Sequence, residues 1–180
     1  MVEVYQGAKK FFTQTLEQAL ARHGLEMSDE AQNYLSRMLE QFAVKFESQS
    51  NLLEPTLQYQ LIVDQTQKLQ RQSSRQLGDH CLFLVGYFYE FVAQQGSGWV
   101  RYHADIGANA YQQAGREPCP ELAQKFTDLY VIIGDLHLPH IDEKRVIEIY
   151  EKWLQTGDRY YESLLLGKGI IPQRIKADKN

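Results

Sequence analysis

The chain of 180 residues contains little cysteine and no long apolar run. Its two cysteines, Cys81 and Cys119, do not form the dense, even framework of a small disulfide-rich secreted domain. We therefore expect two reduced thiols in a cytoplasmic protein. The longest apolar stretch, residues 81–93, is interrupted by Glu90 and is too short to span a bilayer, so no membrane segment is expected.

Positive charge is also sparse. The chain has 19 Lys and Arg against 23 Asp and Glu, a net charge of −4. Proteins that bind nucleic acids usually carry a basic stripe. The nearest feature here is the C-terminal end, with Arg174, Lys176 and Lys179, which is more typical of a solubilising terminus. No nucleic-acid partner is expected.

Signatures of catalysis are missing as well. There is no Gly-x-Ser-x-Gly elbow, and Gly96-Ser97-Gly98 lacks the Gly-Lys-Ser/Thr ending of a phosphate loop. Cys81 has His80 beside it, but adjacent helical residues diverge by about 100°. The sequence therefore gives no catalytic residue and no cofactor.

What the sequence does contain is helical periodicity. Apolar residues recur every three or four positions along most of the chain, and no region alternates in the manner of a strand. We predict an all-α fold in which residues 1–170 form one helical domain and residues 171–180 a flexible tail. Six to eight helices should surround the segment from His80 to Gln95, which is apolar on nearly every face and therefore central.

Capping residues and glycines predict where these helices begin and end. Two points stay open. Gly78-Asp79 marks either a helix break with Asp79 as the cap or a kink in a longer helix. The periodicity of the last helix also allows it to continue past Gly157. The expected helices are residues 2–22, one capped by Ser28, a glutamine-rich one from Pro55, residues 80–95, residues 99–115, one carrying Leu122 to Ile133 before a loop over 134–141, and one starting near Asp142.

Glycine inside a helix costs about 1 kcal/mol relative to alanine, so helical glycines need a reason. If the helices on either side of residue 97 form an antiparallel hairpin, Gly86 lies level with Gly107 and Gly78 with Gly115. Two such levels predict backbones in close approach. The same register places Asp79 near Arg116.

Two interpretations of the Asp79 region follow. In the first, Asp79 is a structural carboxylate held by Arg75 and Arg116, with a lowered pKa, and Asp79→Asn should reduce stability. In the second, Arg75, Asp79, Tyr111 and Arg116 line a polar pocket for a small molecule, with or without catalysis.

The segment Asp135-Leu-His137-Leu-Pro-His140-Ile-Asp142 holds four potential metal ligands. Its spacing is not a recognised metal motif, and Asp142 is better explained as the cap of the last helix. His137 and His140 are therefore weak candidates for a metal site, and no bound metal is expected.

The segment Arg75-Gln-Leu-Gly78-Asp79-His-Cys-Leu-Phe-Leu-Val-Gly86-Tyr-Phe resembles one shared by a family of uncharacterised bacterial helical proteins. Residues 102–111, with Gly107, Ala110 and Tyr111, and residues 27–35 are similar to further parts of that family. The resemblance covers roughly residues 25–111 and implies an intracellular bacterial protein. It implies no activity, substrate or catalytic residue.

The leading functional hypothesis is a non-catalytic interaction or scaffold module whose partner is another protein or a second copy of the chain. It rests on the missing site chemistry, the glutamine-rich helix and the 11 tyrosines, a residue type suited to interfaces. A small-molecule protein with a pocket near Asp79 is the alternative, and a metal protein using His137 and His140 is the third.

We predict that the chain does not bind zinc tightly through His137 and His140, because their spacing does not match a zinc motif. Equilibrium dialysis of the wild type and His137→Ala against zinc checks this. Stoichiometric zinc in the wild type that disappears in the variant would contradict the prediction.

Overall fold

A computed structural model describes residues 2–45, 67–96, 98–136 and 142–173, and these ranges form helices and turns without strands. The predicted all-α single-domain bundle is confirmed, although the described ranges hold more helices than expected. They are α1 (Val2–His23), α2 (Asp29–Lys45), α4 (Gln67–Tyr87), α5 (Tyr89–Gln94), α6 (Trp99–Ala114), α7 (Cys119–Gln124), α8 (Phe126–Asp135), α9 (Glu143–Thr156) and α10 (Arg159–Gly167). Pro55 and the predicted linker before it lie outside these ranges.

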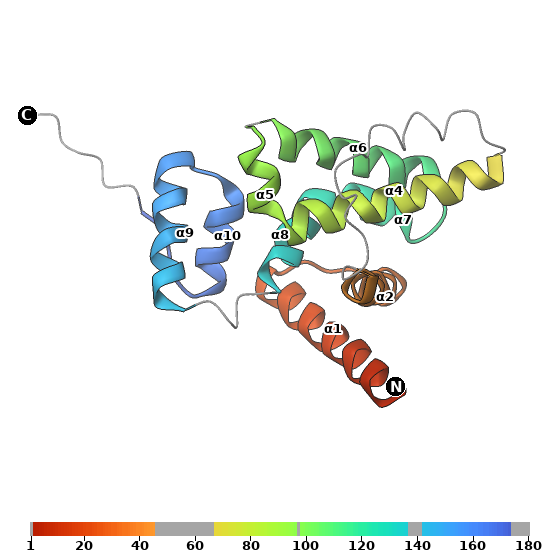
Figure 1. Ribbon diagram of the computed structural model, residues 1–180, viewed down its shortest axis with the longest axis horizontal. Coiled ribbons are helices and arrows are strands. Elements are labelled where there is room, and N and C mark those ends of the chain that lie inside the picture. The colour runs from red at the N-terminus through yellow and green to blue at the C-terminus, as the bar shows by residue number, and fades with distance from the viewer. Residues whose placement is uncertain (1, 46–66, 97, 137–141, 174–180) are drawn as a thin grey trace, which may run out of the picture.

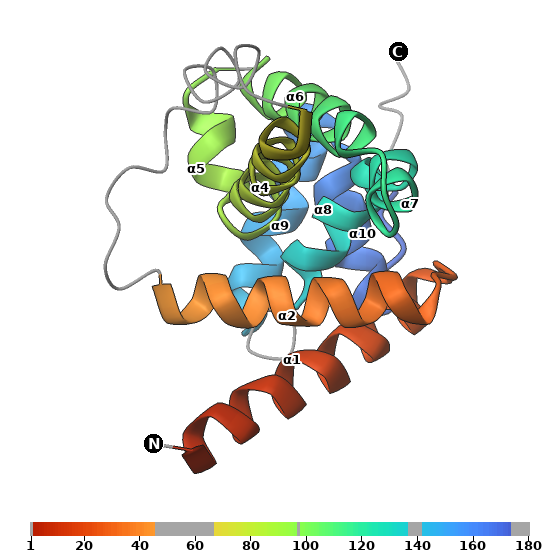
Figure 2. The same ribbon diagram turned by 90° about the vertical axis from the view of Figure 1, so that its right-hand side faces the viewer.

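The first helix begins and ends close to where the sequence predicts, and the second begins at its predicted cap. Gly24 follows α1 with a φ of 61°, which favours glycine. The hydroxyl of Ser28 accepts a hydrogen bond from the Ala31 amide at 3.2 Å and so caps α2. Figure 2 shows α1 and α2 lying together along one side of the bundle.

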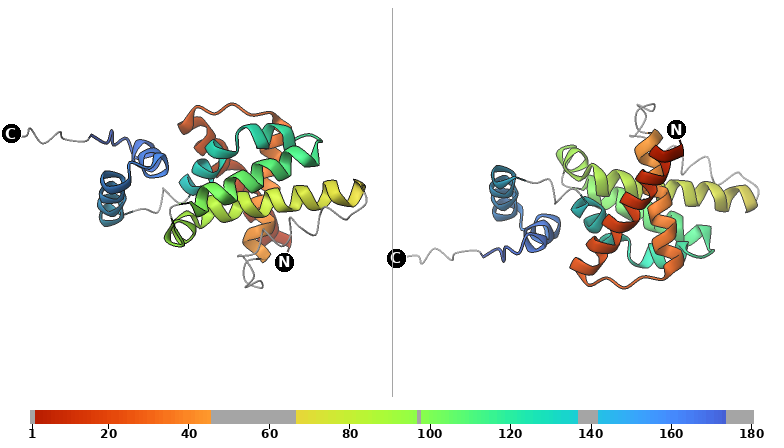
Figure 3. Two further views of the ribbon diagram at one scale, coloured as in Figure 1. Left: turned by 90° about the horizontal axis from the view of Figure 1, so that it is seen from above. Right: turned by 90° about the horizontal axis from the view of Figure 1, so that it is seen from below.

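The centre of the bundle is the antiparallel pair of α4 and α6, which lie side by side in Figures 1 and 3. α4 runs through Gly78 without interruption, so Asp79 is an interior residue and not a helix cap. The predicted central segment is fully buried from Cys81 to Gly86. It does not continue as one helix to Gln95, because α4 ends at Tyr87 and the short α5 leaves at a steep angle (Figure 1).

This change of direction displaces the predicted hairpin register. A Cβ added at Gly78 would lie 2.5 Å from Cδ1 of Tyr111, and one at Gly107 would lie 2.7 Å from Cβ of Cys81. The prediction that glycines meet glycines is therefore wrong. Each glycine instead receives a side chain of the opposite helix. Gly86 does not face α6 closely: its added Cβ would meet Cβ of Ile133 in α8 at 2.7 Å.

α8 differs from the predicted loop over residues 134–141. It extends through Gly134 to Asp135, and Gly134 is a packing residue and not a helix end, since the Tyr160 ring lies where its side chain would be. Residues 137–141 of the predicted loop lie outside the described ranges. Asp135 is fully buried, and its Oδ2 lies 2.9 Å from Arg22 and 3.0 Å from Nε2 of His23. It therefore joins α8 to α1.

The last two helices form a pair beside the centre of the bundle (Figure 3). Gly157, with a φ of 67°, ends α9, so the helix does not continue past it. Asp142 caps α9 as predicted, accepting from the Arg145 amide at 2.8 Å, and Asp158 caps α10. Glu90 on α5 holds the pair in place through Arg145 on α9, at 2.7 Å.

None of the helices in these ranges has an apolar stretch of the length that a bilayer crossing requires.

We expect Gly86→Ala to reduce the free energy of unfolding by about 1–3 kcal/mol, because the new methyl group overpacks the contact with Ile133. The intrinsic preference of alanine for helices acts in the opposite direction, so a measured loss reports packing. Gly98→Ala is the control: a Cβ there meets no atom within 4 Å. A thermal melt in which Gly86→Ala matches or exceeds the wild type would contradict the close approach of α4 and α8.

Candidate functional site

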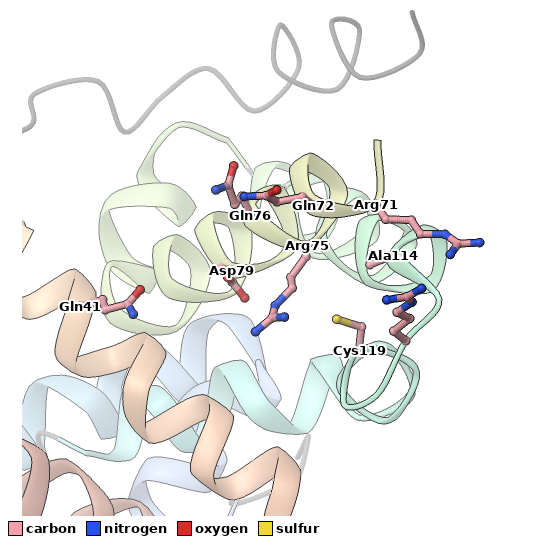
Figure 4. Close-up of a pocket in the computed structure, with 9 residues that line it drawn as sticks. Gln41, Arg71, Gln72, Arg75, Gln76, Asp79, Ala114 and Cys119 are labelled. Carbon is pink, nitrogen blue, oxygen red and sulfur yellow. The ribbon is translucent and has the colours of Figure 1, made fainter. Parts of the chain in front are cut away.

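One face of α4 carries three charged residues at intervals of four. Arg71, Arg75 and Asp79 share this face because residues four apart lie one above the other on a helix. Figure 4 shows Arg75 and Asp79 extending from α4 toward α2, the helix that carries Gln41. The start of α7 and the turn before it close the other side with Cys119 and Arg116.

These elements enclose a pocket of about 610 Å³. Its volume is within the usual range for small-molecule sites. Apart from Ala114 and Cys119, every lining residue has a charged or amide side chain. The lining consists of Gln41, Arg71, Gln72, Arg75, Gln76, Asp79, Ala114, Arg116 and Cys119.

Asp79 is held by two tyrosine hydroxyls. Tyr34 of α2 donates to its Oδ1 at 2.5 Å, and Tyr111 of α6 donates to the same oxygen at 2.8 Å. Tyr111 is fully buried. Its ring lies on the backbone of Gly78, which has no side chain to prevent that contact. Three helices therefore converge on one carboxylate oxygen.

Arg75 acts on this carboxylate through Tyr34. Its Nε donates to the Tyr34 hydroxyl at 2.9 Å, and its guanidinium carbon lies 4.3 Å from the centre of the Tyr34 ring. Among the residues that the structure describes, no carboxylate lies within ion-pair distance of Arg71, Arg75 or Arg116. The direct pairing of Asp79 with two arginines is therefore not formed.

The pKa of Asp79 shifts opposite to the sequence prediction. Burial raises the pKa of this carboxyl above its usual range, although the hydrogen bonds from Tyr34 and Tyr111 and the charge of Arg75 act to lower it. The predicted lowered pKa is wrong, because two neutral hydroxyls take the place of two cations. An upward shift is the direction that a general base requires.

The two tyrosines and the cysteine of the site keep their protons at neutral pH. Burial raises the pKa of Tyr34 and Tyr111, and the charge of Asp79 raises both further, so both remain donors. Burial also raises the pKa of the Cys119 thiol, to about 11. A thiol in this state is a poor nucleophile. The site thus offers cations, neutral donors and one carboxylate.

The structure brings together all four residues predicted for this site. Arg75, Asp79 and Arg116 line the pocket, and Tyr111 lies behind Asp79. Sequence reasoning missed Arg71, which is detectable because it precedes Arg75 by four residues. It also missed Tyr34, which has no local signal because it comes from a helix 45 residues earlier in the chain.

Two of the four potential metal ligands have other roles. Asp135 is helical and bonded to Arg22 and His23, and Asp142 is a helix cap. His137 and His140 lie outside the described ranges. Within those ranges no group of three or more His, Cys, Asp or Glu is arranged to hold a metal ion.

We expect the pKa of Asp79, followed by carboxyl NMR in a pH titration, to lie above the ordinary value of 3.8. A raised folded-state pKa means that this group stabilises the fold most below its unfolded-state pKa. That stability is lost as the pH rises through the folded-state pKa.

Asp79→Asn should therefore leave stability at neutral pH unchanged or raise it, since the amide oxygen can accept from both tyrosines without a buried charge. This is the reverse of the loss predicted from the sequence. A titration at or below the ordinary value, together with a lower melting temperature for Asp79→Asn, would contradict the interpretation.

The chain was compared with family models, curated proteins and solved structures, and none of them matches it. The resemblance to a bacterial helical family therefore stays a prediction.

Proposed function

We propose that this protein binds a small anionic molecule, one that carries a carboxylate or phosphate group, in the Asp79 pocket. The observation that carries the proposal is the charge of the lining. Among the described lining residues there are three arginines, Arg71, Arg75 and Arg116, and one carboxylate, in a chain whose net charge is −4. Guanidinium groups are well suited to carboxylate and phosphate, because their planar fork matches both bidentately.

The arrangement of the arginines is unfavourable without such a ligand. Arg71 and Arg75 are like charges four residues apart on one helix, which destabilises a helix by about 0.2–0.5 kcal/mol. No carboxylate of the described ranges pairs with either of them. An anion between Arg71, Arg75 and Arg116 would remove this repulsion.

The rest of the lining suits a ligand with a polar body. The amides of Gln41, Gln72 and Gln76 offer both donors and acceptors, and Asp79 offers an acceptor. Of the described lining residues, only Ala114 and Cys119 lack a charged or amide group. A hydroxylated or amine-bearing acid fits this combination better than a lipid.

The scaffold hypothesis and the pocket hypothesis make different demands on this region. A scaffold needs a filled core at the level of Asp79, whereas ligand binding needs a concave polar cavity there. The pocket of about 610 Å³ supports the second. A protein partner or second copy of the chain stays a prediction.

The test is calorimetric titration with sodium phosphate and, separately, sodium succinate at constant ionic strength. We expect saturable binding of at least one of them. Arg71→Gln and Arg116→Gln should each weaken it about tenfold or more, since a charge-assisted hydrogen bond contributes about 1.5–3 kcal/mol. Arg37→Gln, an exposed change on α2 outside the pocket lining, is the matched control and should bind as the wild type does.

Asp79→Asn gives a test of opposite sign. It removes the single negative charge found among the described lining residues and should strengthen anion binding. Absence of saturable binding of both anions, or equal affinity in Arg71→Gln, Arg116→Gln and Arg37→Gln, would contradict the proposal.

A further inference from the structure

A second pocket, of about 650 Å³, lies between α5, α6, α8 and the start of α10. In Figure 1 these helices meet where α5 faces α10. The pocket shares no lining residue with the Asp79 pocket. Its wall is aromatic instead of cationic: Tyr89, Tyr130 and Tyr161 come to it from three different helices.

The three rings are fixed at different angles. Tyr89 and Tyr130 have ring centres 6.1 Å apart with planes inclined by 25°, whereas Tyr89 and Tyr161 are 5.8 Å apart and inclined by 84°. Tyr160 holds the Tyr89 ring in place by stacking on it, with 3.6 Å between ring centres. The contact of Tyr89 with Tyr161 is the edge-to-face packing that aromatic pairs prefer, and it gives the rings at this wall planes of different direction.

The charge of this wall has the sign opposite to that of the first pocket. Asp158 accepts from the Tyr89 hydroxyl and from the Tyr160 amide, the latter at 3.0 Å. Within the ranges that the structure describes, no Lys, Arg or His lies at ion-pair distance from it.

The other charges at the pocket compensate each other. Arg101 and Asp105 pair at 3.9 Å, with side chains 88% and 69% exposed. The partly buried carboxylate of Asp158 is therefore the unbalanced charge of the lining.

The tyrosines add no negative charge to this wall. Burial raises the pKa of Tyr89, of Tyr130 and of Tyr161, the last to about 12, so all three remain neutral phenols. One of these three tyrosine rings already lies near an ammonium group. Nζ of Lys152, which pairs with Glu90, is 5.7 Å from the centre of the Tyr161 ring.

We propose that this second pocket binds a small organic ammonium ion, with its cationic head on the faces of Tyr130 and Tyr161 and its charge balanced by Asp158. Attraction between a cation and a ring face requires a separation of about 6 Å or less from the ring centre. A methylated ammonium group suits such a wall better than a metal ion, because it is weakly hydrated and has apolar methyl groups to place against the rings. The proposal is independent of anion binding at Asp79.

The test uses choline chloride as the probe, titrated into the full chain and followed by calorimetry at constant ionic strength. The neutral carbon analogue of choline, in which a tert-butyl group replaces the trimethylammonium group, has the same shape and no charge. We expect saturable binding of choline and binding of the analogue at least about tenfold weaker.

Three variants locate the site. Asp158→Asn keeps an acceptor for Tyr89 and a good helix cap while removing the charge, and should weaken choline binding about fivefold or more. Tyr130→Phe keeps the ring face and should bind nearly as the wild type does, whereas Tyr130→Leu should lose most of the affinity. Arg71→Gln, in the other pocket, should have no effect, and a thermal melt of each variant confirms that it is folded.

Absence of saturable choline binding would overturn the proposal. Equal affinity for choline and its neutral analogue would overturn it as well, since the pocket would then be apolar only. Unchanged affinity in folded Asp158→Asn and Tyr130→Leu would place choline elsewhere and have the same consequence.

Discussion

The contact between the Tyr111 ring and the backbone of Gly78 determines most of what lies around it. A side chain at residue 78 would occupy the position of the ring, so α4 and α6 approach this closely only because residue 78 is glycine. The approach buries Tyr111 completely and directs its hydroxyl to Asp79. Since the carboxylate is one helical turn from Arg75 and two from Arg71, the same contact fixes the floor of the pocket. The packing of α4 against α6 and the geometry of the site therefore depend on the same contact.

Neutral hydroxyls around Asp79 leave the arginines of the lining available. If Asp79 paired directly with Arg75 and Arg116, the carboxylate would neutralise part of their positive charge and less of it would be available to a ligand. Tyr34 and Tyr111 satisfy the carboxylate instead, and Arg75 is linked to it only through Tyr34. This arrangement keeps cationic character at one pocket while the uncompensated Asp158 gives the other the opposite character. The described lining of the first pocket is therefore net positive, and that of the second is net negative.

Local signals predicted much of the fold, and contacts between distant segments explain the rest. Caps at Ser28 and Asp142 and the glycine after α1 are encoded within a few residues, and each was predicted correctly. The hairpin register failed because it assumed one straight arm from α4 to residue 97, whereas the chain bends after Tyr87.

The candidate site shows the same division between local and distant signals. Arg75 and Asp79 were predicted to be close because they are four residues apart on one helix. Arg116 was placed near them by a hairpin register that proved wrong, and it reaches the pocket from the turn before α7. The prediction of a lowered pKa failed because burial of Asp79 outweighs the hydrogen bonds from Tyr34 and Tyr111, and this burial arises from contacts between distant segments. Charged residues at helical spacing can be recognised in a sequence, but the distant groups that hydrogen-bond to a buried charge cannot.

The ring stack between Tyr89 and Tyr160 has a consequence for how the bundle opens. Buried residues fall into two clusters, one around α4 and α6 and one around α9 and α10, and the partly buried Tyr130 packs against both. The stack lies inside the second cluster, where Val85 of α4, Tyr89 of α5 and Val131 of α8 pack with the α9–α10 pair. The ion pairs of Glu90 with Arg145 and Lys152 reinforce this contact. The first cluster contains no described residue of α9 or α10, so we expect the amide hydrogens of this pair to exchange with solvent more readily than those of α4 and α6.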